Sequence, residues 1–163
     1  MNWEAISSIG EIVCALAVVI TLGYLAVQVK HAKAATADNS RLIRANGVRD
    51  MCLEMCRNDA LRMTQTKNWG LGAYYEELAE KLGDSVEEAT RVDWANCYYF
   101  WMYWGQYSST TETRDLDELE HVIGGLCSTP GMKLSWETSP LNRPLLQDEF
   151  VAFVDRIIAK QSV

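Results

Sequence analysis

The sequence predicts an all-α protein, in which an N-terminal transmembrane helix continues into a long helix and a small cytoplasmic helical domain follows. Almost every residue from Ile9 to Val29 is apolar, and this run has the length of a membrane span. Helix-forming residues dominate the next stretch, and from Lys30 to Gln65 it holds one glycine and no proline. No segment shows the alternating pattern of a half-buried strand.

Composition and charge narrow the class of protein. With 163 residues, the chain is long enough for one span and one small domain with its own core. A formal net charge of −7 without clustered Lys and Arg argues against a nucleic-acid partner. Five cysteines, one of them inside the apolar run, do not suggest a disulfide framework. We expect free thiols in a reducing compartment.

The apolar run has the properties of a span. A bilayer core about 30 Å thick needs roughly 20 helical residues. Between Ile12 and Val27 only Thr21 and Tyr24 are even weakly polar, whereas a core helix of a soluble domain normally shows a polar stripe. A signal peptide would begin with basic residues, but "MNWEAISSIG" contains none. We expect residues 1–8 to form a short external N-terminus and residues 9–29 a transmembrane helix.

Basic residues mark the flank that follows the span. Those basic residues are Lys30, Lys33, Arg41, Arg44 and Arg49. Because positive residues stay on the cytoplasmic side, the N-terminus is predicted outside and the remaining chain in the cytoplasm.

One carboxylate, Glu11, lies near the start of the span. Two interpretations are open. Glu11 is close enough to the outer headgroups to reach water or to be protonated there, or it belongs to a face that contacts another helix. Small and polar residues on one face allow helices to pack closely in lipid, and an ionisable group there is a functional hypothesis. The candidate contact residues are Gly10, Glu11, Cys14, Ala17, Thr21 and Gln28.

Residues 30–66 are predicted to form a juxtamembrane helix, with Val48, Met51, Cys52 and Met55 on one stripe. The sequence "NWGLG" at residues 68–72 ends it, and the helical domain is assigned to residues 67–163.

Turn and cap residues divide that domain. A helix over 74–82 ends at Gly83, and Ser85 with Glu88 forms a capping box that opens a helix to about Tyr107. Asp115 with Glu118 opens a helix that ends before "GGLCSTPG". Prolines limit the region of Trp136 to a short turn. A last helix over about 146–160 carries Leu146, Phe150, Val154 and Ile157 on one face.

The segment "WANCYYFWMYWGQY" is unusually aromatic. As a helix, it places Trp94, Trp101 and Trp104 on one stripe and Tyr99 and Tyr103 on another. The segment is either a central core helix or a partly exposed protein interface, since Trp and Tyr dominate such contacts. A third alternative is an amphipathic helix on the membrane surface, but its acidic flanks and lack of basic residues argue against this.

No set of residues in the sequence predicts a metal site or a catalytic site. Cys52 and Cys56 have the spacing of metal ligands on a helix, but a closed zinc site needs four ligands and the only histidines are His31 and His121. Glu118 and His121 have the i, i+3 spacing of di-iron bundles, without the second pair that such a site needs. We assign no catalytic residue, metal or cofactor.

The opening "MNWEAISSIGEIVCALAVVITLGYLAVQVKHAKAATA" and the later "TPGMKLSWE" and "DEF" resemble an uncharacterised family of small proteobacterial single-pass membrane proteins. The resemblance covers both ends of the chain and departs from the family at Cys14, where glycine or alanine is expected. It implies a bacterial inner-membrane location and carries no activity.

The leading hypothesis is a self-associating scaffold or an accessory subunit of a membrane complex. Its expected partners are membrane lipid and either copies of itself or a larger complex. The alternative is a homo-oligomeric cation pore lined by Glu11, Thr21 and Gln28, because a ring of carboxylates selects cations. An enzyme ranks third, since no nucleophile–base pair is present.

Overall fold

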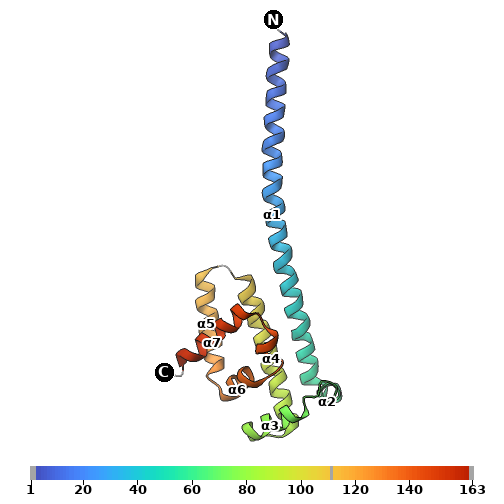
Figure 1. Ribbon diagram of the computed structural model, residues 1–163, viewed down its shortest axis with the longest axis vertical. Coiled ribbons are helices and arrows are strands. Elements are labelled where there is room, and N and C mark those ends of the chain that lie inside the picture. The colour runs from blue at the N-terminus through green and yellow to red at the C-terminus, as the bar shows by residue number, and fades with distance from the viewer. Residues whose placement is uncertain (1–2, 111, 162–163) are drawn as a thin grey trace. The chain divides into compact units, whose positions relative to one another are not determined.

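The computed structural model describes residues 3–110 and 112–161, apart from the side chains of residues 4–9. Within these ranges the chain is helical and has no strand, which confirms the predicted fold class (Figure 1). The elements are α1 (Trp3–Arg57), α2 (Asp59–Asn68), α3 (Gly72–Leu82), α4 (Val86–Ser109), α5 (Thr113–Cys127), α6 (Pro130–Thr138), the 3₁₀ turn η1 (Arg143–Leu145) and α7 (Asp148–Gln161).

The chain divides into an N-terminal unit, residues 1–40, and a C-terminal unit, residues 41–163. The boundary lies inside α1, so this helix contributes residues to both units. Sequence analysis assigned the helical domain to residues 67–163, whereas the compact unit also takes in α2 and the end of α1. Those segments belong to it because they supply buried core residues, among them Ala45 and Cys52.

The N-terminal unit is the apolar part of α1. Its large apolar side chains from Ile12 to Val29 are between 50% and 70% exposed. This is a helix long and apolar enough to cross a membrane, and none of its most apolar stretch is buried within the described protein.

A helix break at Asn58 was not predicted. The sequence suggested one helix to about Gln65, but α1 ends at Arg57 and α2 begins at Asp59. Asn58 adopts an extended backbone (φ −112°, ψ 92°), and its side-chain oxygen accepts a hydrogen bond from the Leu61 N–H at 3.0 Å. Asn is a good N-cap but only mildly unfavourable within a helix, so the sequence alone did not distinguish the two.

The predicted limits of α3 and α4 are close to the observed ones. Gly83 ends α3 in the left-handed conformation (φ 73°), and its N–H donates to Ala79 O at 2.9 Å. Ser85 caps α4 by accepting from the Glu88 N–H at 3.2 Å. Both local signals therefore act as the sequence indicated.

The predicted limits of α5 were wrong at both ends. The helix begins at Thr113 and continues through Gly124 and Gly125 to Cys127. A β-carbon at Gly124 would approach Ile157 to 3.5 Å, and the Gly124 carbonyl accepts from the Gln161 side-chain amide. The close approach of α7 thus explains a glycine inside the helix.

Two smaller corrections concern the prolines. Pro130 starts a nine-residue helix, α6, rather than restricting Trp136 to a short turn. Proline is tolerated at the first helical position because the N–H that it lacks has no intrahelical partner there. Helix α7 starts at Asp148, since Leu146 is still extended (φ −94°, ψ 161°) after η1.

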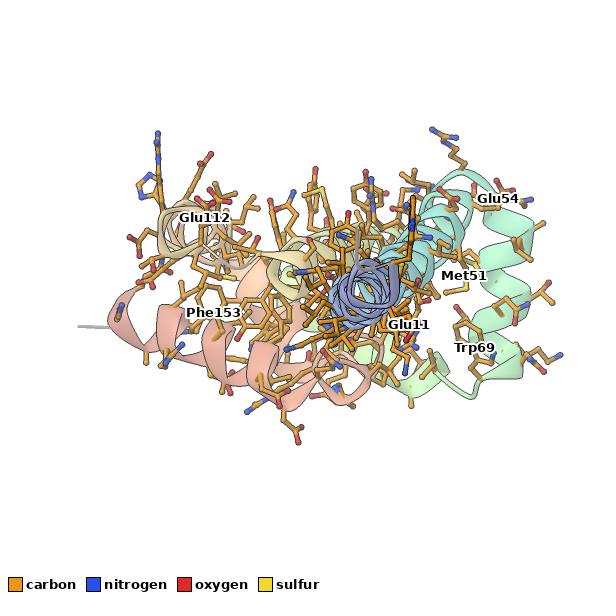
Figure 2. All side chains as sticks on the ribbon, turned by 90° about the horizontal axis from the view of Figure 1, so that it is seen from above. Glu11, Met51, Glu54, Trp69, Glu112 and Phe153 are labelled. Atoms are coloured by element: carbon orange, nitrogen blue, oxygen red, sulfur yellow. The ribbon has the colours of Figure 1, made fainter. Side chains whose placement is uncertain are left out.

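Helix α4 is central to the C-terminal unit. It packs against α3, α5 and α6, while α7 crosses and contacts α5 (Figure 1). The predicted apolar face of the last helix is buried, with Phe150 and Val154 both 0% exposed. Phe153 also points from α7 into the interior (Figure 2).

The end of α1 approaches α4 closely at Gly105. A β-carbon at this position would lie 3.1 Å from Ala45 Cβ and 4.0 Å from Leu42 Cδ2. Small residues on both helices therefore set the distance between them, and nearby Cys52 and Met55 are buried in the same core.

We expect Gly105→Val to destabilise the protein by about 1–3 kcal/mol, because the added methyl groups overpack the α1–α4 contact. Urea unfolding of the full chain in a non-ionic detergent, followed by near-ultraviolet circular dichroism, measures this. Gly125→Val is the matched control, since a β-carbon there meets nothing within 4 Å. Equal stability of the two variants would contradict the close contact.

Candidate functional site

The predicted membrane face lies on the N-terminal unit. Gly10, Glu11, Cys14, Ala17, Thr21 and Gln28 are all exposed. Helical spacing places the small residues among them along one side of α1. The Thr21 hydroxyl donates to Ala17 O at 2.7 Å, so this donor is satisfied within the helix. A neighbouring helix can therefore approach this side closely without desolvating an unpaired hydroxyl donor.

The aromatic residues suggested as an interface are mostly core residues. Trp94, Trp101, Trp104 and Tyr103 are only 1%, 8%, 2% and 6% exposed, and Tyr99 alone is 39% exposed. This corrects the interface hypothesis for the four buried residues. They are buried because α4 is surrounded, as the core interpretation of the same segment expected.

Ring contacts and hydrogen bonds hold these residues in place. Trp101 and Trp104 meet edge to face with centroids 5.3 Å apart, and the Trp104 indole N–H donates to Gln147 Oε1 at 3.2 Å. The indole N–H groups of Trp94 and Trp101 are buried without a partner. Their packing therefore depends on apolar contact rather than on polar pairing.

A buried carboxylate that sequence analysis missed lies beside them. Asp93, on α4, is 0% exposed. It accepts hydrogen bonds from Ser135 Oγ at 2.5 Å, Ser139 Oγ at 2.9 Å and Tyr75 Oη at 3.4 Å. These three donors come from α3, α6 and the residue after α6, so one side chain connects three segments.

The hydrogen bonds toward Asp93 form two directed chains. Asn142 Nδ2 donates to Ser135 Oγ at 2.9 Å, and Ser135 in turn donates to Asp93. The Leu141 N–H donates to Ser139 Oγ at 3.2 Å, and Ser139 donates to the other carboxylate oxygen. Donors arranged in series polarise one another, which strengthens the network in a low-dielectric core.

Burial and hydrogen bonding have opposite effects on Asp93. Burial is the larger effect and raises the pKa of the carboxyl group, while the hydroxyl donors lower it. Burial also raises the pKa of Tyr75, and the neighbouring Asp93 acts in the same direction. Asp93, Ser135 and Ser139 are 0%, 1% and 2% exposed, so the cluster is closed to solvent and its clearest role is to hold the fold.

A sequence signal for this network existed but was incomplete. Asp93 is a carboxylate within an otherwise apolar helical face beside Trp94 and Cys97. Such a residue needs buried partners. Its partners at Ser135 and Ser139 lie more than 40 positions away, and no local pattern indicates that they meet it.

The cysteines of the C-terminal unit are shielded from solvent to different degrees, whereas Cys14 on α1 is exposed. All five are free thiols, and Cys52 and Cys97 are 0% and 2% exposed. The adjacent Cys52 thiol and burial raise the pKa of Cys97, and burial raises that of Cys56 and brings that of Cys127 to about 11. Within the described residues, no group of three or more His, Cys, Asp or Glu side chains is placed to hold a metal ion.

Comparison with known proteins identifies no relative. No protein family, curated protein or solved structure matches this chain significantly.

Replacing Asp93 with asparagine should change how stability depends on pH. Native Asp93 keeps its proton to a higher pH than the unfolded chain does. Its contribution is therefore favourable in acid, and stability falls as pH rises from about 4 through the native pKa. Asp93→Asn has no carboxyl group at this position, so its stability should not show this fall as pH rises. The measurement is urea unfolding of both proteins between pH 4 and pH 8.

Asp59→Asn is the control for this experiment, because Arg62 and Arg91 lower the pKa of that exposed carboxyl group. Its contribution has the opposite sign and is lost as pH falls. Parallel pH profiles for Asp93→Asn and the unaltered protein would show that Asp93 does not titrate as its burial requires.

Proposed function

We propose that this protein is a single-pass bacterial inner-membrane protein whose cytoplasmic helical unit acts as a self-associating scaffold or as an accessory subunit of a membrane complex. One observation carries the proposal: a helix with exposed apolar side chains from Ile12 to Val29 belongs to the same continuous α1 that enters the core of the C-terminal unit.

The exposed apolar helix supports a membrane location. Burying apolar surface is worth about 25 cal/mol per Å², so a helix of this length is strongly favoured in hydrocarbon over water. All backbone groups in its interior are paired within the helix, as a lipid-exposed span requires.

The basic flank supports a cytoplasmic C-terminal unit. Lys30 and Lys33 follow the apolar stretch and are exposed, while Glu11 lies at its other end. Positive charge in the first residues after a span favours retention of that side in the cytoplasm. The buried free thiols of the C-terminal unit are compatible with a reducing compartment.

Self-association is supported by the small, exposed face of α1 that contains Gly10, Cys14 and Ala17. In lipid, close backbone approach rather than the hydrophobic effect drives helix pairing, and small residues permit that approach.

We expect the full chain to remain in the membrane fraction after extraction at alkaline pH, and a C-terminal green fluorescent protein fusion to fluoresce in cells. The physical reasons are the uninterrupted apolar helix and the positive flank. A matched alkaline phosphatase fusion at the same position should be inactive, because that enzyme folds only outside the cytoplasm. Active phosphatase or a soluble protein would contradict the proposed topology.

Cys14 offers a direct test of self-association. It is exposed on the small face of α1, so oxidation of native membranes with copper phenanthroline should link two chains through it. We expect a dimer on non-reducing electrophoresis that disappears in Cys14→Ala.

The control moves the thiol to the other side of the helix. In the double variant Cys14→Ala, Leu16→Cys, the thiol lies at a similar depth about 200° around α1, as 100° per residue requires. Cross-linking there as efficient as at Cys14 would mean random collision rather than a specific contact face.

A further inference from the structure

A cavity of about 470 Å³ lies between α2 and the starts of α3 and α4, within the C-terminal unit. This volume is in the range of small-molecule sites, about 300–1,000 Å³. Its lining is mainly apolar, and Met63 and Val86, 64% and 44% exposed, contribute to it. An apolar ligand body would find a complementary surface there.

A buried guanidinium group also lines the cavity. Arg62 is only 1% exposed, which is rare for arginine. Its Nη1 donates to Met55 O at 2.9 Å and its Nη2 to Asp59 Oδ1 at 2.7 Å. Both anchors fix the side chain in position, and the Asp59 carboxylate already pairs with its positive charge.

Two helix starts line the same cavity. Gly72 is the first residue of α3, which has no side-chain cap and no acidic residue in its first turn. Val86 is the first residue of α4. Ser85 caps α4, and Glu87 and Glu88 lie in its first turn, so that helix start is already compensated. The uncapped start of α3 carries unpaired N–H groups and partial positive charge, which favour an anion nearby.

The C-terminal end of α2, whose carbonyl groups carry partial negative charge, also lies near the cavity but does not present free carbonyl groups to an anion. Its last carbonyl groups are occupied, because the N–H groups of Trp69 and Leu71 donate to Gln65 O and Thr66 O, each at 2.9 Å. Lys67 adds a positive charge to the cavity wall. The Thr66 hydroxyl is buried without a partner and lines the cavity, so a ligand oxygen could pair with it.

One carboxylate, Glu87, also lines the cavity, but its charge is already engaged. Arg91 Nη2 lies 3.3 Å from Glu87 Oε1, and Arg62 Nη2 lies 3.7 Å from it. Asp59 engages the charge of Arg62 in the same way, so Lys67 supplies the positive charge that a ligand anion would meet beside the mainly apolar lining.

We propose that this cavity binds an amphiphile with one anionic headgroup, a carboxylate or a phosphate ester, attached to a hydrocarbon chain. The apolar lining disfavours a bare inorganic anion, because such an ion would lose its hydration without sufficient compensation. The Lys67 ammonium group and the uncapped start of α3 favour an anionic amphiphile over a neutral one of the same length.

The test is equilibrium dialysis of the full chain in nanodiscs against radiolabelled octanoate, octyl phosphate, octanol and inorganic phosphate, with binding to empty nanodiscs subtracted. We expect saturable binding of both octyl anions, with a Kd of about 0.1 mM. Octanol should bind at least tenfold more weakly, and inorganic phosphate alone should show no saturable binding. Comparison of the two anions distinguishes a fatty-acid-like ligand from a phospholipid-like one.

Cavity filling provides the first variant. A β-carbon at Gly72 meets nothing within 4 Å, so Gly72→Leu places its side chain in the space without a backbone clash. We expect at least a tenfold loss of affinity. Gly47→Leu is the control, because Gly47 is also unobstructed and lies outside the cavity, and it should bind as the unaltered protein does.

Charge removal provides the second variant. Lys67→Gln should weaken the binding of both anions about fivefold and leave octanol unchanged. Lys81→Gln is the control, since Lys81 pairs with Glu77 and does not line this cavity. Absence of saturable binding, equal affinity for octanol and octanoate, saturable binding of phosphate alone, or unchanged affinity in Gly72→Leu would each overturn the proposal.

Discussion

The rest of the structure depends on the packing of the end of α1 against α4. Helix α1 is continuous, so the helix that packs there is the one that also carries the exposed apolar stretch. Gly105 and Ala45 allow the two helices to approach closely, and Cys52 and Met55 extend the contact into the core. The same helix carries the apolar side chains from Ile12 to Val29. A helix interior satisfies its own backbone polar groups in any solvent, so α1 needs no change of structure between a hydrocarbon environment and a protein core. Only the side chains differ along α1: those from Ile12 to Val29 are apolar on all sides of the helix, whereas after residue 40 a single stripe is buried.

Helix α4 provides the other half of that contact and organises the rest of the C-terminal unit. Its aromatic side chains supply large apolar area, while Asp93 introduces a polar group that the surrounding segments must satisfy. Apolar contact alone tolerates many arrangements of helices. A buried carboxylate with donors at Ser135, Ser139 and Tyr75 is more restrictive, because any arrangement that removes a donor leaves a desolvated group unpaired. Specificity of packing is the role that this network supports best, because it is closed to solvent.

The proposed membrane role and the proposed ligand cavity depend on different parts of the molecule. The membrane role depends on the exposed apolar side chains and small face of α1. The cavity lies within residues 62–90, and its preference for an anion depends on Lys67 and the start of α3. The two proposals are therefore physically separable, and either can hold without the other. If both hold, a membrane-anchored scaffold would also respond to an amphiphile of the kind that a membrane supplies.

Local features of this protein were determined by the sequence itself. The apolar run, the caps at Ser85 and Gly83, and the buried face of α7 follow from hydrophobic periodicity and backbone preferences, which act over a few residues. Tertiary structure alone decided that Trp94, Trp101 and Trp104 are core residues, that Asp93 meets Ser135, and that Arg62 lines a cavity. It also decided that α5 continues through two glycines, because α7 packs against Gly124. Each of these depends on residues distant in the chain, and a local pattern shows that a side chain needs a partner without showing which segment provides it.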